Sequence, residues 1–257
     1  MNEVRIGSVT LGEGRPRICI PICGGDLSRL SEEIRHAVLA GAELLEIRAD
    51  CFIRNALHPS MAPLLRALPE RVPLPMILTF RTRPEGGMGD PQHYVPLVLE
   101  GIRSGRFDAL DLEVRIGEDT FVRLRDLARA QGMRIIASAH DFAATPPTDS
   151  METLFDNMDR LEADVLKLAV MPAGMEDVLR LLLALERTRQ HCQRPLIGIA
   201  MGKPGIVTRL MCEAFGSCLT FAAADAQSAP GQIRAEDLAG ILRIIHQTLK
   251  SEGENTP

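Results

Sequence analysis

Residues 134–170 read RIIASAHDFAATPPTDSMETLFDNMDRLEADVLKLAV and contain a strand–helix–strand pattern. The runs at 134–139 and 165–170 are apolar almost without interruption, which is typical of strands buried on both faces of a parallel sheet. Between them, residues 150–161 carry apolar side chains at three- and four-residue spacing, as an amphipathic helix does. This stretch therefore predicts one parallel βαβ unit.

The same alternation recurs along the whole chain. We expect further strands at 18–22, 44–48, 76–80, 109–114, 196–201 and 218–222, and further helices at 30–40, 120–131 and 175–190. Eight units in about 240 residues match an α/β fold of the (β/α)8 TIM-barrel type better than an open doubly wound sheet.

The two ends of the chain carry additional signals. Residues 4–17, with a turn at Gly12-Glu13-Gly14, predict an N-terminal β-hairpin that closes the barrel floor. Residues 252–257 are polar, and we expect them to be a frayed tail. No linker divides the chain, so residues 1–257 are expected to form a single barrel domain.

Composition narrows the classes of function. The 257 residues carry a formal net charge of −5, which provides no overall field for nucleic acid or anionic lipid. No apolar run is long enough to span a membrane, and residues 1–14 lack the apolar centre of a signal peptide, so we expect a cytoplasmic protein. The six cysteines form no CxxC pair and are interpreted as buried, reduced thiols. We expect neither a metal nor a cofactor, since no metal-ligand, P-loop or dinucleotide spacing occurs.

Polar residues gather where the predicted strands end, which is where TIM barrels place their active sites. Glu46 and Arg48 lie two apart and therefore project to the same side of one strand. They are interpreted either as ligand-binding groups or as an internal salt-bridge network that fills the barrel. The other strand ends carry Arg81, Glu85, Asp111, Glu113, His140, Lys167, Arg209 and Gln232.

Lys167 is the most informative of these residues. Only three of the 29 basic residues are lysines, and this one interrupts the apolar run 165–170. One interpretation is structural, with Glu113 or Asp111 as the carboxylate partner. The favoured interpretation is catalytic: burial and neighbouring arginines would lower the pKa of the amine, and a neutral amine can form an imine with a ketone.

His140 ends the strand beside that of Lys167 and is interpreted as a general acid and base. Either Asp141 or Glu85 could fix its tautomer. Residues 228–232, Ser-Ala-Pro-Gly-Gln, are interpreted as a small-residue lid or as an ordinary surface loop.

Several motifs, taken in order, resemble the type I 3-dehydroquinate dehydratase family along the whole chain. They are Glu46-x-Arg48-x-Asp50, Thr79-Phe80-Arg81, Glu85-Gly86-Gly87, His140-Asp141-Phe142, 167–172, 201–209, Phe215-Gly216-Ser217 and 228–232. Two positions depart from the expected pattern: Thr208 stands where serine is common, and Pro21 stands where some members offer a serine.

The resemblance implies a lyase that converts 3-dehydroquinate into 3-dehydroshikimate in the shikimate pathway, by syn elimination of water through a Schiff base. It assigns the Schiff base to Lys167 and proton transfer to His140, supported by Glu85. It also implies that substrate oxygens are bound by Glu46, Arg48, Arg81, Arg209, Ser228 and Gln232. A homodimer is implied as well.

Two other classes of function stay open on the sequence alone. A class I aldolase-like barrel also needs an imine-forming lysine, but it would cleave a carbon–carbon bond. A non-catalytic carboxylate-binding barrel could keep the same pocket. Whether the enzyme serves biosynthesis or quinate catabolism is left open too.

Overall fold

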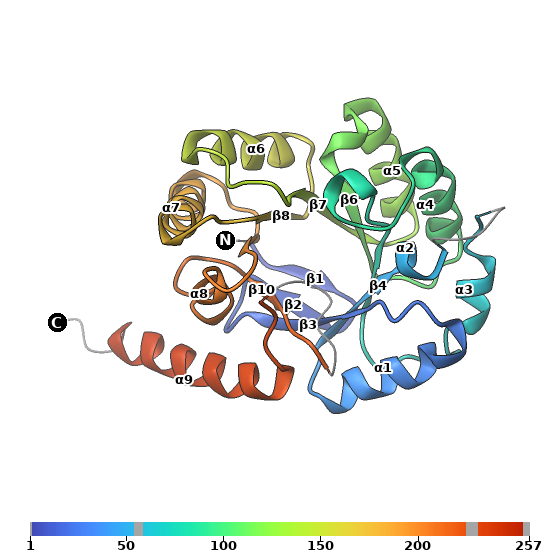
Figure 1. Ribbon diagram of the computed structural model, residues 1–257, viewed down its shortest axis with the longest axis horizontal. Helices are drawn as coiled ribbons and strands as arrows, with labels where there is room; N and C mark the ends of the chain where they lie inside the picture. Colours follow the sequence, from blue (N-terminus) through green and yellow to red (C-terminus); the bar gives the residue numbers. More distant parts are fainter. Residues whose placement is uncertain (1, 54–58, 225–230, 254–257) are drawn as a thin grey trace.

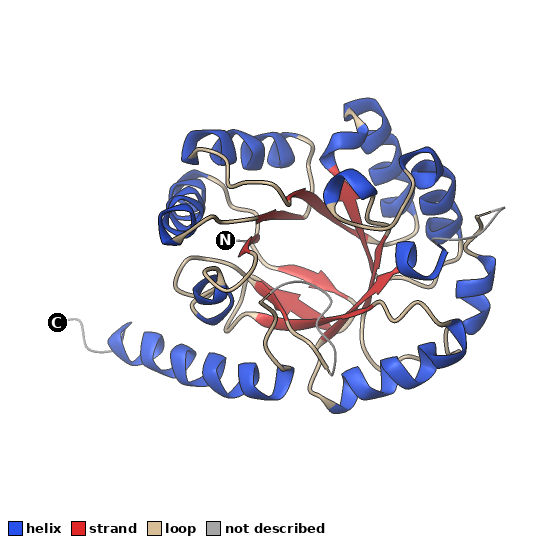
Figure 2. Cartoon of the chain, viewed as in Figure 1, coloured by secondary structure: helices blue, strands red, loops and turns tan. Residues whose placement is uncertain are grey.

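The computed structural model describes residues 2–53, 59–224 and 231–253. Its strands form an inner ring, and its helices lie around the outside of that ring (Figures 1 and 2). The strands of the ring are β3 (Arg17–Ile22), β4 (Leu44–Arg48), β5 (Met76–Thr79), β6 (Ala109–Glu113), β7 (Arg134–Asp141), β8 (Val165–Val170), β9 (Leu196–Ala200) and β10 (Leu219–Phe221).

Helices connect successive strands, and a last helix follows β10. Those described are α1 (Leu30–Leu39), α2 (Ala49–Ile53), α3 (Ala62–Ala67), α4 (Tyr94–Arg103), α5 (Glu118–Ala130), α6 (Thr148–Arg160), α7 (Met175–His191), α8 (Ile206–Leu210) and α9 (Ala235–Gly253). Among the described residues, no helix combines the length and the apolarity that a membrane crossing requires.

The eight strands are parallel and follow the order β10-β3-β4-β5-β6-β7-β8-β9. The ring closes between β9 and β10, where the Cys218 amide donates to the Leu196 carbonyl at 2.8 Å. The (β/α)8 barrel predicted from the sequence is therefore confirmed, and every predicted strand lies within two residues of an observed one.

Two separate apolar clusters explain why the strands read as continuous apolar runs. The outer cluster packs strand residues such as Leu45, Leu110 and Leu166 against the surrounding helices. In the lower barrel, the inner cluster has a layer with one residue from each strand: Cys19, Leu44, Ile77, Ala109, Ile136, Val165, Ile197 and Leu219. Because side chains alternate between the faces of a strand, adjacent residues supply both clusters.

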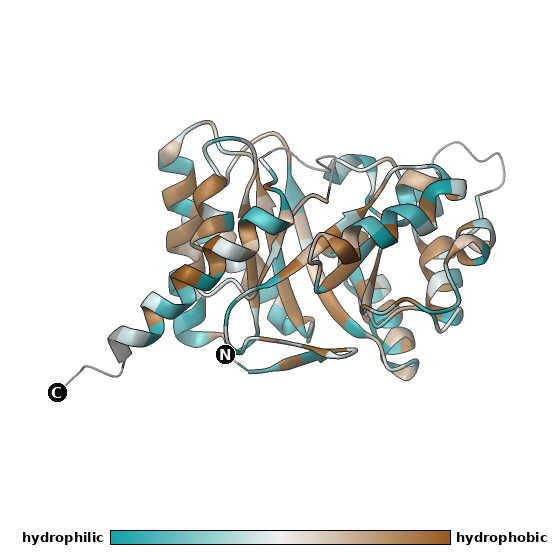
Figure 3. Cartoon of the chain, turned by 90° about the horizontal axis from the view of Figure 1, so that it is seen from below, coloured by the Kyte–Doolittle hydropathy of each residue, from teal (hydrophilic) through white to brown (hydrophobic). Residues whose placement is uncertain are grey.

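The N-terminal hairpin consists of β1 (Val4–Ile6) and β2 (Val9–Leu11), and it lies across the lower end of the barrel (Figure 3). Ile6 and Leu11 belong to the inner cluster and so close the floor, as predicted. The predicted position of the turn was wrong. The strands are joined at Gly7-Ser8, because Gly7 adopts a φ of 54° and permits a two-residue loop, whereas Gly12–Gly14 follows the hairpin.

The predicted C-terminal tail needs a similar correction. Helix α9 continues through Gly253, so residues 252 and 253 are helical rather than frayed. No proline or earlier glycine in that last turn interrupts the backbone hydrogen bonding of the helix. Residues 254–257 lie outside the described part of the chain.

Candidate active site

A cavity of about 290 Å³ opens at the carboxyl ends of the barrel strands. This volume suits a small molecule. The cavity brings together eight of the nine residues expected to form the site: Glu46, Arg48, Arg81, Glu85, His140, Lys167, Arg209 and Gln232. The ninth, Ser228, and most of the predicted lid fall outside the described residues.

The polar floor of this cavity follows from the strand alternation. On β4 to β8, the residue two positions after the inner apolar layer is polar and buried in every case: Glu46, Thr79, Asp111, Ser138 and Lys167. Hydrogen bonds join these side chains across the barrel, including Thr79 Oγ1 to Glu46 Oε1 at 2.9 Å. The interior therefore changes from apolar to polar within two residues along each of these strands.

Lys167 occupies the centre of this polar layer, with 4% of its surface exposed. Its Nζ lies 2.9 Å from Asp111 Oδ2 and 3.4 Å from Glu46 Oε1. The ring of Phe221 lies 4.5 Å from the same atom. Among the described residues, the groups in contact with the amine are thus two carboxylates and an aromatic ring, not the arginines expected from the sequence. Of the two carboxylate partners considered for a structural lysine, Asp111 makes the contact.

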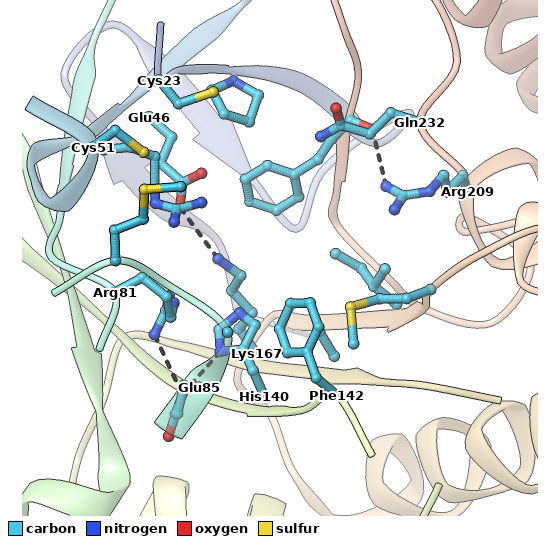
Figure 4. Close-up of a pocket in the computed structure, with 18 residues that line it drawn as sticks. Cys23, Glu46, Cys51, Arg81, Glu85, His140, Phe142, Lys167, Arg209 and Gln232 are labelled. Atoms are coloured by element: carbon cyan, nitrogen blue, oxygen red, sulfur yellow. Dashed lines mark hydrogen bonds and ion pairs between the residues drawn. The ribbon is translucent and has the colours of Figure 1, made fainter. Parts of the chain in front are cut away.

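His140 and Glu85 form a buried pair near the amine (Figure 4). His140 Nδ1 lies 3.0 Å from Glu85 Oε2, so Glu85 rather than Asp141 orients the imidazole. Asp141 instead accepts backbone amide hydrogens from Ala143 and Ala144. The imidazole nitrogen left for proton exchange is Nε2.

Burial shifts the pKa of both partners. The pKa of Glu85 is raised to about 8 by burial, with Glu113 and Asp111 adding to the effect of burial and Arg81 opposing it. The pKa of His140 is held well below its usual value by burial and by the positive charges of Arg81 and Lys167. At neutral pH the imidazole is therefore neutral, with one ring N–H, and the carboxyl group of Glu85 is protonated.

A short turn delivers Glu85 to this position. The 3₁₀ helix Arg83–Glu85 follows β5 and ends at Gly86, whose φ is 77°. The ring of Phe142 lies where a side chain on residue 86 would stand. Glycine therefore serves two purposes here, because it permits the left-handed turn and leaves room for the aromatic wall.

Arg81 is almost fully engaged by the protein. Its Nη1 donates to Glu113 at 3.0 Å, to Ser138 at 3.0 Å and to Glu85 at 3.4 Å. Its Nη2 donates to Asp111 at 2.7 Å. The guanidinium therefore connects the partner of His140 to the partner of Lys167, in addition to lining the cavity.

Glu46 and Arg48 both line the cavity, as their spacing predicts, and both are also tied to the protein. Glu46 accepts from Thr79 and from Lys167. Arg48 forms a two-pronged contact with Asp50, with both donor–acceptor distances at 2.9 Å. The binding and structural interpretations of these residues are therefore compatible.

Arg209 and Gln232 lie across the cavity from Glu46 and Arg81 (Figure 4). Arg209 lies in α8, is 2% exposed and donates from Nη1 to the Phe221 carbonyl at 3.1 Å. Burial lowers its pKa to about 10. A bound anion would favour the charged form of this buried guanidinium.

Several lining residues were not assigned to the site from the sequence. They include Cys23, Cys51, Phe142, Met201 and Phe221. The alternation of the strands was the available signal for Phe221, since it lies two residues beyond the inner-layer Leu219. Nothing in the sequence marks Cys23 and Cys51 as neighbours. In the described residues, no group of three or more His, Cys, Asp or Glu side chains is arranged to hold a metal ion.

Comparisons with known proteins agree with this geometry. The family model of type I 3-dehydroquinase matches residues 18–249. A 3-dehydroquinate dehydratase of Clostridium novyi (strain NT) is 36% identical over 97% of this chain and 100% of its own length. One from Escherichia coli O8 (strain IAI1) is 35% identical over 96% of this chain and 100% of its own length.

A solved structure of a 3-dehydroquinate dehydratase is also similar to this chain. The type I 3-dehydroquinate dehydratase of Clostridium difficile, solved with covalently modified comenic acid, superposes with a TM-score of 0.88 at 33% identity. The match covers 96% of this chain and 98% of that one. With the family model and the curated relatives, this near-complete coverage leads to one assignment: the chain belongs to the type I 3-dehydroquinase family.

Proposed function

We propose that this protein dehydrates 3-dehydroquinate to 3-dehydroshikimate, in the shikimate pathway, through a Schiff base on Lys167. Family membership supports the dehydration, and the observation that carries the mechanism is the position of the Lys167 amine. It is buried in the cavity that the imidazole of His140 also lines, and the two residues lie on neighbouring strands. A primary amine in such a place can condense with the C3 ketone of a bound substrate.

Each step conserves atoms and charge. Lys167 gives up one proton of its ammonium group to attack the ketone as a free amine, and that proton returns as one water leaves, so ammonium and ketone give a protonated imine and one water. His140 Nε2 removes a proton from C2, and the electrons move onto the imine nitrogen to form an enamine. The enamine then expels the C1 hydroxyl, which takes the proton from His140 and leaves as a second water. A final water hydrolyses the imine, so the net reaction loses one water.

Substrate recognition rests on the charged walls of the cavity. Arg209 suits the substrate carboxylate, because a guanidinium can donate to two oxygens at once. Gln232 supplies a side-chain amide for neighbouring oxygens, and Ser228, assigned on the resemblance alone, would supply a hydroxyl. Glu46 and Arg48 would contact ring hydroxyls from the other side, and Arg81 would do so through the donor capacity left by its internal contacts.

Reductive trapping tests the proposal. Borohydride is added during turnover of 3-dehydroquinate, and the modified lysine is located by peptide mass mapping. We expect substrate-dependent labelling of Lys167 and of neither Lys203 nor Lys250, the two other lysines of the chain. Lys167→Ala should abolish both the labelling and the near-ultraviolet absorbance of the enone product.

The alternatives give different results in the same assay. An aldolase-like barrel would label Lys167 but would yield two carbon fragments and no enone. A non-catalytic binding barrel would bind the substrate without any labelling. Labelling of Lys203 or Lys250 instead would overturn the assignment of the amine.

We also propose that the protein acts as a single-domain, cytoplasmic homodimer. Helix α7 leaves Met175, Leu179 and Leu183 exposed at four-residue spacing, so they share one face of the helix. Such a stripe supports self-association. Light scattering should give twice the chain mass, and Leu179→Glu with Leu183→Glu should reduce it to the monomer mass.

A further inference from the structure

Resting on the proposed function, we infer that Asp111 is the fixed counter-ion of the reacting nitrogen and holds the Schiff base on Lys167 in its protonated form. Asp111 lies on β6 and was considered from the sequence only as a structural partner. Its Oδ2 atom lies 2.9 Å from Lys167 Nζ, which is closer than Glu46 at 3.4 Å. Because it touches the reacting atom, Asp111 belongs to the catalytic residues.

The carboxylate is held rigidly in this position. Its other oxygen, Oδ1, accepts from Arg81 Nη2 at 2.7 Å and from Ser138 Oγ at 2.5 Å. Asp111 is 1% exposed, so water does not compete for these contacts. With Oδ1 held from two sides, Oδ2 is directed at the amine and cannot rotate away without breaking both bonds.

Its charge state suits a counter-ion. Burial alone would raise the pKa of Asp111, but the positive charges of Arg81 and Lys167 hold it well below the usual range. Asp111 therefore stays ionised while the nearby His140–Glu85 pair exchanges a proton. The two carboxyl groups have separate tasks: one keeps a constant charge and the other carries a proton.

The balance of the condensation shows why a constant charge is useful. A protonated amine and a ketone give a protonated imine and water, so the nitrogen is positive before and after the step. Only a protonated imine attracts electrons strongly enough to form the enamine. A carboxylate within hydrogen-bond distance of that nitrogen stabilises its charged form and keeps it protonated to higher pH.

Other groups also face the Lys167 nitrogen and affect whether it keeps its proton. Glu46 from β4 adds a second negative charge, and the Phe221 ring from β10 adds a favourable cation–π contact. Arg81 and His140 oppose the positive charge when they are protonated. Cys19 from β3 stays neutral, because burial raises the pKa of its thiol. Asp111 is the closest of the negative groups.

The test compares the pH dependence of imine trapping in the full-length enzyme and in Asp111→Asn, which keeps the size of the side chain and removes the charge. Cyanoborohydride reduces the protonated imine selectively, and the adduct on Lys167 is measured by intact mass after a fixed time. We expect the pH of half-maximal trapping to fall by at least about one unit in the variant, a tenfold loss of proton affinity.

Two matched variants separate charge from packing. Ser138→Ala removes the 2.5 Å hydrogen bond to Asp111 but leaves the carboxylate, so its trapping profile should stay close to the wild-type profile. Glu46→Gln removes the more distant carboxylate and should shift the profile by less than Asp111→Asn does. A shift in Ser138→Ala equal to that in Asp111→Asn would assign the effect to packing and overturn the inference.

A second measurement covers the case in which Asp111→Asn does not fold. The wild-type enzyme is labelled with ¹⁵N on its three lysine amines, and the adduct nitrogen of Lys167 is followed by NMR as the pH rises. We expect the signal of a protonated imine throughout the range in which the enzyme is folded. A nitrogen that loses its proton near neutral pH would overturn the inference.

The two proposals fail in different ways. If the wild-type enzyme gives no adduct on Lys167, the Schiff-base function itself is wrong. If the wild-type adduct forms and Asp111→Asn traps with an unchanged pH profile, the function stands and the role of Asp111 is wrong.

Discussion

His140 Nδ1 and Glu85 Oε2 lie 3.0 Å apart, and the carboxyl group is fully buried beneath the imidazole. Neither residue can be titrated independently at this distance. With the pKa of Glu85 raised to about 8 and that of His140 lowered, the neutral pair has its proton on Glu85. When the pair loses the proton on Nε2, the proton of Glu85 moves to Nδ1, which then donates to the carboxylate, and Nε2 is free to act as a base.

This pairing predicts how activity depends on pH. Below a pH of about 8, Nε2 carries a proton and is not available as a base. We therefore expect kcat/KM to rise with pH and to level off once the pair has lost that proton. Glu85→Gln removes the titrating carboxyl, so its lower kcat/KM should change little in this range. A wild-type profile that is flat between pH 6 and about 8, or a Glu85→Gln profile that keeps the rise, would contradict this.

His140→Ala should separate covalent capture from proton transfer. The variant keeps Lys167 and both carboxylates around its amine, so borohydride trapping with 3-dehydroquinate should still label Lys167. Turnover should fall by about 10² to 10⁴, because no positioned base remains at C2. Mass mapping and the rate of enone formation are the two measurements. Equal loss of labelling and turnover would mean that His140 is needed before elimination.

Arg209 should govern substrate affinity more than the chemical step. Loss of a charged hydrogen bond costs about 1.5–3 kcal/mol, so Arg209→Gln should raise KM by roughly 10- to 100-fold with a smaller effect on kcat. Arg209→Lys keeps the charge but loses the two-pronged geometry and should give an intermediate KM. Steady-state kinetics with 3-dehydroquinate measures both. An unchanged KM in Arg209→Gln would show that the carboxylate binds elsewhere.

Gly86→Ala should weaken both stability and activity. The added methyl group meets the ring of Phe142 and forces a left-handed turn on a residue that disfavours it. Gly132→Ala is the matched control, because Gly132 has a φ of 79° but open space at the same position. The control should lose about 1–2 kcal/mol in urea unfolding, from the backbone alone.

The collision at residue 86 should add about 1–3 kcal/mol to that loss. Only Gly86→Ala should also reduce kcat/KM, because residue 86 follows the carboxyl that orients His140. Equal losses in the two variants would mean that Phe142 moves aside without cost.

Much of the fold could be predicted from the sequence, since apolar runs and glycines report local conformation directly. The position of Lys167 could be predicted for the same reason, because a charged residue inside a strand stands out against its neighbours. The partners of each side chain could not be predicted. Asp111 and Glu113 are equivalent by alternation, and only the stagger of β6 against β8 brings Asp111 to the amine while Glu113 binds Arg81 and Thr82.

The hairpin turn shows the same limit at short range. Gly7 and Gly12 both allow a reversal of the chain, and the choice depends on which register buries Ile6 and Leu11 in the barrel floor. That information lies in the strands above the hairpin, not in the turn itself.

The closed barrel floor limits how substrate, product and water can enter and leave the cavity during a reaction cycle. With Ile6 and Leu11 filling the lower end, 3-dehydroquinate, its product and every water molecule that is formed or consumed would have to pass the same upper rim. Entry of the next substrate would then have to wait until the previous product has left. A substitution at that rim would change the rates of arrival and departure together, even where it touches no reacting atom.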